Sequence, residues 1–143
     1  MNDRVLVTGA TGFIGHHLVH ALLEKGDRVG CLVRPTSDTS RLPTEQVYLA
    51  IGDITDPTSL QSALAGVGVI YHLAGALTAK SRAAFHTVNE AGVRNLVEAC
   101  ARAGSPPTLV ALSSLAAAGP NTDDQPRREQ DPDAPISNYG RSK

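Results

Sequence analysis

Two side chains that could move a proton lie at the end of the chain. Tyr139 and Lys143 are four residues apart in a Y-x-x-x-K pattern, so on a helix they would share one face. An ordinary phenol, with a pKa of about 10, is a poor base near neutrality. A neighbouring ammonium group favours the phenolate. The pattern alone favours an exposed amphipathic pair without a chemical role, whereas a position after the fifth strand of a parallel sheet favours proton exchange with a hydroxyl or carbonyl group.

Two adjacent serines could contact the same reacting oxygen. Ser113 and Ser114 follow the apolar run Thr108–Leu112, where a strand would end. A hydroxyl at the end of a strand can hydrogen-bond a substrate, or it can cap neighbouring backbone groups. Both interpretations, and both serines, remain open on the residues alone.

Five short apolar runs are the candidate strands that would position these groups: 5–7, 29–33, 47–51, 67–73 and 108–112. Helical spacing between them predicts helices from Ile14 to Gly26, from Pro57 (capped by Asp56) to Gly66, and over 83–103 with a left-handed cap at Gly104. This alternation predicts an α/β, Rossmann-type, doubly wound parallel sheet in strand order 3-2-1-4-5, with residues 1–143 as one domain. Residues 120–137 carry no apolar period and are predicted to form a loop.

Three glycines directly follow the first predicted strand. In the run VLVTGATGFIG, Gly9, Gly12 and Gly15 are spaced three apart, and a helix pattern begins behind them. In an open parallel sheet, ligands bind beyond the carboxyl ends of the strands at the switch point, where a glycine turn lets backbone approach a diphosphate. The diphosphate then lies on the helix amino terminus. The glycines predict a dinucleotide site, and the alternative is a tight turn alone.

Arginine at the end of the second predicted strand bears on the choice of dinucleotide. An NAD enzyme usually ends this strand with an acidic residue that holds the ribose 2′-hydroxyl. This chain has Arg34, followed by Arg41, and a guanidinium group suits a 2′-phosphate. We therefore expect NADP, with NAD as the alternative.

Charge and composition exclude several other functions. The formal net charge is −1, which provides no basic field for nucleic acid or an anionic membrane. No apolar stretch approaches the ~18 residues of a membrane span, and no secretory signal pattern is present, so we expect a cytoplasmic protein.

His16, His17 and His20 lack the glutamate and third ligand of an H-E-x-x-H site, and we expect no metal. Cys31 and Cys100 are expected to be core residues.

The motifs jointly resemble the extended short-chain dehydrogenase/reductase family, which includes NAD-dependent epimerases and dehydratases and reductases of the dihydroflavonol and 3β-hydroxysteroid type. Residues 8–15 (TGATGFIG) resemble its glycine motif, and HLAG at 72–75 resembles its H-L-A-A segment. The resemblance implies that cofactor contacts come from Gly9, Thr11, Gly12, Phe13, Ile14, Gly15, Arg34, Asp53, Ile54, Leu73, Ala74, Gly75, Asn89 and Lys143. It implies Ser114, Tyr139 and Lys143 as the catalytic residues, because the distance to Gly119 favours Ser114 over Ser113.

The resemblance also implies an activity. It is hydride transfer between NAD(P) and a small molecule with a hydroxyl or carbonyl group, by a reductase or a sugar-nucleotide epimerase. Dehydratases of the family carry an Asp-Glu pair after the catalytic hydroxyl, where this chain has Leu115 and Ala116. Many epimerases of the family have an aromatic residue before the glycine of this segment, where this chain has Ala118, and this difference favours a plain reductase. The family pattern continues beyond Lys143, so the chain is expected to be the cofactor-binding part of a longer, homodimeric enzyme. The alternative is a dinucleotide-binding module without turnover.

Overall fold

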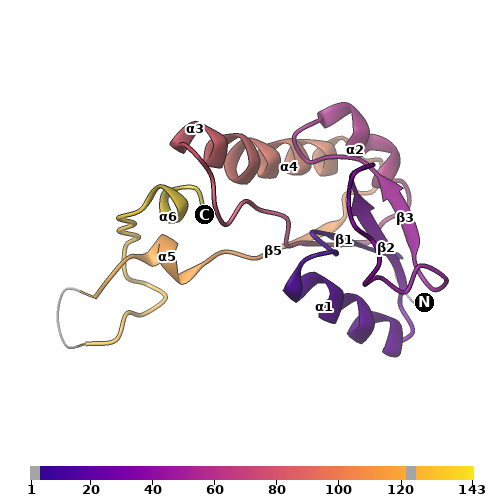
Figure 1. Ribbon diagram of the computed structural model, residues 1–143, viewed down its shortest axis with the longest axis horizontal. Coiled ribbons are helices and arrows are strands. Elements are labelled where there is room, and N and C mark those ends of the chain that lie inside the picture. The colour runs from indigo at the N-terminus through magenta and orange to yellow at the C-terminus, as the bar shows by residue number, and fades with distance from the viewer. Residues whose placement is uncertain (1–3, 122–124) are drawn as a thin grey trace.

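A parallel five-stranded sheet forms the centre of the molecule (Figure 1). The computed structural model describes residues 4–121 and 125–143, so residues 122–124 of the predicted 120–137 loop lie outside the described part. The strands are β1 (Arg4–Thr8), β2 (Arg28–Val33), β3 (Tyr48–Ile51), β4 (Val69–His72) and β5 (Thr108–Ala111). Their order is β3-β2-β1-β4-β5, and every pairing is parallel. The predicted fold class and strand order are confirmed.

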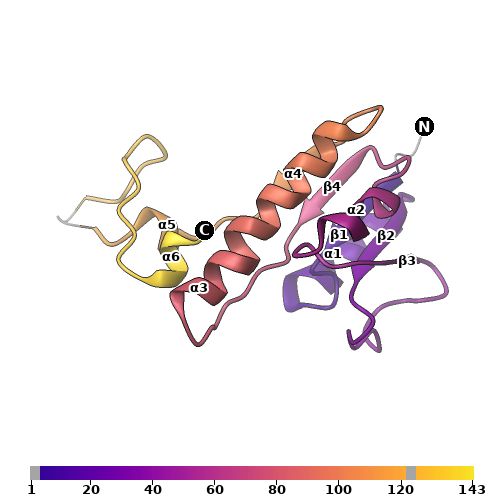
Figure 2. The ribbon, with the colours of Figure 1, turned by 90° about the horizontal axis from the view of Figure 1, so that it is seen from above.

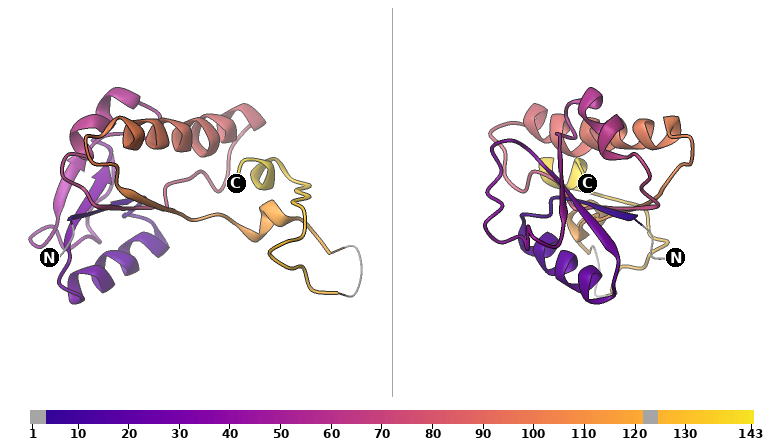
Figure 3. Two further views of the ribbon diagram at one scale, coloured as in Figure 1. Left: turned by 180° about the vertical axis from the view of Figure 1, so that it is seen from behind. Right: turned by 90° about the vertical axis from the view of Figure 1, so that its right-hand side faces the viewer.

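Helices cover both faces of this sheet (Figure 3). The helices are α1 (Phe13–Glu24), α2 (Pro57–Ala63), α3 (Arg82–Phe85), the π-helical turn η1 (His86–Ala91), α4 (Gly92–Arg102), α5 (Leu115–Ala118) and α6 (Asn138–Arg141). Of these, α1 covers one face of the sheet, α2 and α4 cover the other, and α5 and α6 lie beyond the sheet. As predicted, the Asp56 side chain caps α2 by accepting a hydrogen bond from the Thr58 backbone N–H. In Figure 2, α3, η1 and α4 form one long rod that runs beside β4 and extends past the sheet toward α6.

Two details of the predicted helices are wrong. The helix predicted over 83–103 is interrupted by the π turn η1, a form that often marks functional sites within α-helices. Gly104 is not a left-handed cap, because α4 ends at Arg102 and Ala103 already has extended backbone, with φ −68° and ψ 142°. Sequence periodicity also missed α5, a single turn whose amino terminus is capped by Ser114.

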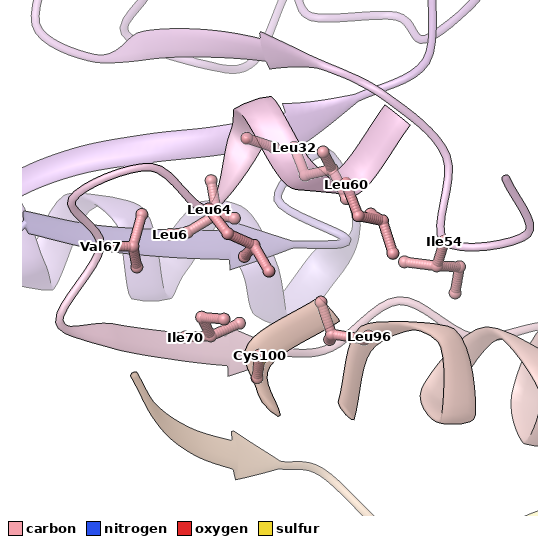
Figure 4. Close-up of a cluster of buried hydrophobic side chains, with 10 residues drawn as sticks. Leu6, Leu32, Ile54, Leu60, Leu64, Val67, Ile70, Leu96 and Cys100 are labelled. Carbon is pink, nitrogen blue, oxygen red and sulfur yellow. The ribbon is translucent and has the colours of Figure 1, made fainter. Parts of the chain in front are cut away.

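Two hydrophobic clusters hold the helices against the sheet. On one face, side chains of β1, β2 and β4 pack against α2 and α4, and the cluster includes Leu6, Leu60, Leu96 and Cys100 (Figure 4). On the other face, α1 packs on a second cluster that includes Cys31. Both cysteines are buried and unpaired, and burial raises the pKa of the Cys31 thiol to about 11. They are core residues, as predicted.

The carboxyl ends of β1, β4 and β5 meet at one edge of the sheet. Thr8 of β1 lies opposite His72 of β4. The backbone N–H of Leu73 donates to the Thr8 carbonyl at 3.1 Å, and that of Leu112 donates to the His72 carbonyl at 3.1 Å. Groups that follow these three strands are therefore neighbours. Within the described part of the chain, no helix is long and apolar enough to cross a membrane.

Candidate functional site: the glycine turn and the ends of three strands

The turn between β1 and α1 has a backbone that side chains would obstruct. Gly9 has a φ of +70°, and a Cβ there would lie 2.6 Å from the Ala74 backbone nitrogen. A Cβ on Gly15 would collide with the Gly9 carbonyl oxygen. The absence of a side chain at Gly9 thus lets the turn pack against the segment that follows β4, and its absence at Gly15 lets α1 pack against the turn. The glycine spacing is explained by close backbone contact on both sides.

The amino terminus of α1 is open to an anion. Its N-cap is Gly12, which has no side chain to accept the first N–H groups. Phe13 and Ile14, which follow in the first turn, are exposed. The unsatisfied N–H groups and the helix dipole favour a negatively charged group at this position. The turn fits the diphosphate of a dinucleotide, and Thr11 lies in it between the two glycines.

A buried polar pair joins β1 to β4 directly beneath the turn. The Thr8 Oγ1 and His72 Nδ1 atoms are 2.7 Å apart, and Thr8 Oγ1 also accepts a hydrogen bond from the Ala74 backbone N–H at 3.2 Å. Burial, and secondarily the positive charge of Lys143, lowers the pKa of His72 from 6.5 to about 4. His72 is therefore neutral at physiological pH, and the Lys143 ammonium is the charged group nearby.

The lowered pKa predicts a loss of stability in acid. Between pH 6.5 and about 4 the unfolded chain binds a proton at His72 that the folded chain does not, so the free energy of unfolding falls as the pH drops through this window. The full difference is about 3 kcal/mol. In urea denaturation at a series of pH values, His72→Asn should show a correspondingly smaller fall, while a change of the exposed His20 to Asn should keep the wild-type slope. Equal slopes for His72→Asn and wild type would contradict this assignment.

Asn89 in the π turn ties three segments together. Its Oδ1 accepts a hydrogen bond from the Ala76 backbone N–H at 2.7 Å, and its Nδ2 donates to the Ala76 carbonyl at 3.0 Å. The same Nδ2 donates to Ser142 Oγ at 2.9 Å. Asn89 is 5% exposed and Ser142 6%, so these bonds are shielded from water. The loop after β4 and the segment after α6 are both held by one amide.

Lys143 reaches the same edge of the sheet. Its Nζ donates to the Leu112 carbonyl, just beyond β5, at 2.8 Å. A Cβ on Gly75 would lie 3.2 Å from Asn89 Oδ1 and 3.6 Å from Lys143 Nζ, so these groups surround Gly75. Leu73, Ala74 and Gly75 therefore run from the glycine turn to the lysine.

Tyr139 and Lys143 are not on one regular helix. Tyr139 is in α6, which ends at Arg141, and the Lys143 N–H donates to the Gly140 carbonyl three residues back. The expected four-residue helical spacing is replaced here by a tighter turn through Ser142, whose backbone N–H donates to the Tyr139 carbonyl. The Tyr139 ring lies 5.9 Å from that of Phe85 in α3.

The two serines both bond to backbone groups. Ser114 Oγ accepts from the Ala116 N–H at 3.2 Å and so caps α5. Ser113 Oγ donates to the Lys143 carbonyl at 3.2 Å. A Cβ on Gly140 would collide with the Ala116 carbonyl oxygen, so α6, which carries Tyr139, packs directly on the helix that Ser114 caps. This contact brings the segments of Ser114 and Tyr139 together.

The loop after β3 is held from α4. The Asp53 Oδ1 accepts from the Thr55 N–H and from Thr55 Oγ1, each at 2.8 Å. Asn95 Nδ2 donates to the Ile54 carbonyl at 2.9 Å, and a Cβ on Gly92 would lie 2.8 Å from Ile54 Cδ1. Close packing against α4 thus fixes Ile54, which with Asp53 is among the predicted cofactor contacts.

Arg34 and the three histidines are on the surface. Arg34 is exposed just beyond β2, and its backbone N–H donates to Ser37 Oγ at 3.1 Å. The His16 and His17 rings have centroids 3.9 Å apart and are inclined to each other by 38°, and His16 Nδ1 lies 3.2 Å from the Gly12 carbonyl. Across the described residues, no group of three or more His, Cys, Asp or Glu side chains could hold a metal ion.

A large cavity lies away from these groups. It has a volume of about 890 Å³ and is lined by residues from the amino ends of the strands and the ends of α2 and α4, including Arg4, Arg28 and Arg102. The Arg4 guanidinium is engaged by the Ala65 carbonyl and the Tyr48 ring, and that of Arg102 by Glu98. Because ligands of open parallel sheets bind at the opposite, carboxyl ends, this cavity is separate from the candidate site.

The fold and the glycine turn together define a Rossmann-type α/β protein. The profile of the NAD dependent epimerase/dehydratase family matches residues 5–143. The chain belongs to this family, in agreement with its resemblance to the extended short-chain dehydrogenases/reductases.

Similar proteins include both reductases and epimerases. Human 3 beta-hydroxysteroid dehydrogenase type 7 is 35% identical over 92% of this chain and 38% of its own length. The ceramide reductase of Caulobacter vibrioides is 35% identical over 97% of this chain and 39% of its own length. The crystal structure of Thermus thermophilus UDP-glucose 4-epimerase in complex with NAD superimposes with a TM-score of 0.86 and 31% identity, over 97% of this chain and 47% of that one. The chain thus spans less than half the length of these relatives.

Three residues at the site are not predicted by the motifs. Thr8 and His72 were not recognised as a pair, although each ends a strand and the parallel register places them opposite each other. Ser142 was overlooked inside the Y-x-x-x-K pattern because its partner, Asn89, is 53 residues away. The strand ends could have indicated the first pair, whereas no local signal indicated the second.

Proposed function

We propose that the chain is the cofactor-binding part of an NAD(P)-dependent oxidoreductase that acts on a small molecule with a hydroxyl or carbonyl group. The observation that carries the proposal is the position of Lys143. Its Nζ reaches the carboxyl end of β5 and the neighbourhood of Gly75, on the same sheet edge as the glycine turn. The active protein is proposed to be a homodimer, as the resemblance implies.

The predicted cofactor residues would contact different parts of the dinucleotide. The turn of Gly9, Thr11 and Gly12 with the first turn of α1 (Phe13–Gly15) would hold the diphosphate through backbone N–H groups. Asp53 and Ile54 would contact adenine. The 73–75 segment, Asn89 and Lys143 would position the nicotinamide ribose. When bound, the nicotinamide ring supplies hydride donation and acceptance.

Side chains of this chain would exchange the proton with the substrate oxygen. Tyr139 would take the hydroxyl proton of the substrate during oxidation and return it to the carbonyl oxygen during reduction. The Lys143 ammonium would stabilise the phenolate, and Ser114 would hydrogen-bond the reacting oxygen. Ser114 Oγ accepts from the Ala116 N–H, and its O–H can donate to the reacting oxygen without breaking this bond.

The residues after Ser114 favour a reductase over a dehydratase. Leu115 is 90% exposed and Ala116 contributes its carbonyl to the contact with Gly140. Neither can act as the acid and base that elimination of water requires. The sequence similarity to a hydroxysteroid dehydrogenase and a ceramide reductase points the same way, and epimerisation remains the second candidate because the NAD-bound epimerase shares the fold.

Cofactor titration tests the proposal directly. We expect the chain to bind NADPH and NADH with micromolar affinity at low salt, with NADPH preferred, as followed by nicotinamide fluorescence. Arg34→Gln should weaken NADPH binding about tenfold and leave NADH binding unchanged, because the guanidinium group would contact only the 2′-phosphate. Arg128→Gln, an exposed arginine in the loop before α6, is the charge-matched control. A wild-type chain that binds NADH at least as tightly as NADPH would exclude the NADP assignment, and a chain that binds neither would exclude the proposed function.

A further inference from the structure

Ser142 stands between the two predicted catalytic side chains and Asn89. Its hydroxyl accepts a hydrogen bond from Asn89 Nδ2 at 2.9 Å and donates one to the Tyr139 carbonyl at 2.7 Å. It is 6% exposed. A hydroxyl is required for this arrangement, because the group must accept from an amide and donate to a carbonyl at the same time.

The Asn89 amide is already anchored at its other side. Two hydrogen bonds join it to the backbone of Ala76, close to the 73–75 segment that would face the nicotinamide ribose. The bond to Ser142 therefore transmits the position of that segment to the residue next to Lys143. On the opposite side, α6 rests on the Ala116 carbonyl through Gly140.

We propose that Ser142 is a positioning residue that sets the place of Lys143 and Tyr139 relative to the nicotinamide half of the cofactor site. Removing its hydroxyl leaves the buried Asn89 donor short of one partner and removes the hydrogen bonds that link Asn89 to the turn between Tyr139 and Lys143. The adenine half, held by Asn95 and the glycine turn, has no hydrogen bond to Ser142 among the described residues. The inference rests on the proposed function, because it assumes that this edge binds a nicotinamide dinucleotide.

The affinities for two ligands distinguish a positioning role of Ser142 from a general effect on the stability of the fold. ADP occupies only the adenine and diphosphate part of such a site, whereas NADH or NADPH also requires the nicotinamide half. We expect Ser142→Ala to bind the preferred reduced coenzyme about tenfold more weakly than wild type, with ADP affinity changed less than about twofold. Ser142→Thr, which keeps a hydroxyl, should bind both ligands within about threefold of wild type.

Ser137→Ala is the matched control. The Ser137 hydroxyl also belongs to α6, where it accepts from the Gly140 N–H at 2.9 Å, but it is exposed and its bond stays within the helix. It should leave the ratio of coenzyme to ADP affinity unchanged. The measurement is fluorescence titration for the coenzyme and calorimetry for ADP, with circular dichroism to verify folding of each variant.

The outcomes separate this inference from the proposed function. A wild-type chain that binds neither NADH nor NADPH overturns both. If wild type binds, equal coenzyme affinity in Ser142→Ala overturns the positioning role alone. A parallel loss of ADP affinity, or an equal loss in Ser137→Ala, also overturns it, because either result assigns the effect to general loosening of the fold.

Discussion

Replacing Gly9 with alanine should abolish dinucleotide binding and weaken the fold. The residue has a φ of +70°, where an L side chain is strained, and its new Cβ would lie 2.6 Å from the Ala74 nitrogen and 2.8 Å from the Leu73 carbonyl carbon. Backbone atoms cannot rotate away, so the turn must separate from the segment after β4. We expect the free energy of unfolding to fall by about 2–4 kcal/mol. Coenzyme affinity should drop more than about 100-fold, because the turn that would face the diphosphate is displaced.

Gly104→Ala is the matched control for this substitution. A Cβ on Gly104 has no atom within 4 Å, and its φ is not positive. It should bind coenzyme as wild type does and unfold within about 0.5 kcal/mol of it. Urea denaturation and fluorescence titration of the three proteins measure both effects. If Gly9→Ala bound coenzyme with wild-type affinity, the glycine turn would not be the diphosphate site.

The sheet order was predictable because each strand is a short apolar run. Predicted helices separate these runs except between 29–33 and 47–51, where a polar stretch intervenes, and the parallel crossover rule then leaves the order 3-2-1-4-5. The exact residues at which each strand begins and ends were harder to predict. Val67, predicted to belong to the fourth strand, instead has its N–H bonded to the Leu64 carbonyl in the turn after α2. Apolar character alone does not separate a strand from the turn that leads into it.

The sequence predicts residues for the candidate site but not the hydrogen bonds that connect them. The family resemblance predicts roles for Asn89 and Lys143, whereas the π turn that brings Asn89 to both Ala76 and Ser142 has no periodic signature of its own. The bonds that link these residues cross long stretches of chain, from Thr8 to His72 and from Asn89 to Ser142. Such pairs depend on the register of strands and the packing of helices. A single sequence contains no direct record of either.

Tyr139→Phe should give the largest loss of activity in the longer protein that would contain this chain. The substitution removes the hydroxyl that would exchange the substrate proton, and positioned acid–base groups contribute about 10²- to 10⁴-fold to rate. We therefore expect kcat for hydride transfer to fall by about 10³-fold. The phenyl ring retains its contact with Phe85, so the fold around α6 should be preserved.

The affinity for coenzyme separates a chemical role of Tyr139 from a binding role. The Lys143 and Asn89 side chains remain in Tyr139→Phe, so the dissociation constant for the reduced coenzyme should stay within about threefold of wild type. Phe85→Leu is the complementary control, because it alters the ring beside Tyr139 but keeps the hydroxyl, and it should retain most of kcat. Stopped-flow measurement of reduced-nicotinamide absorbance gives the hydride-transfer rate, and fluorescence titration gives the affinity. Unchanged turnover in Tyr139→Phe would exclude Tyr139 as the acid–base group. If neither wild type nor variant turned over while both bound coenzyme, a dinucleotide-binding module without catalysis would be the better assignment.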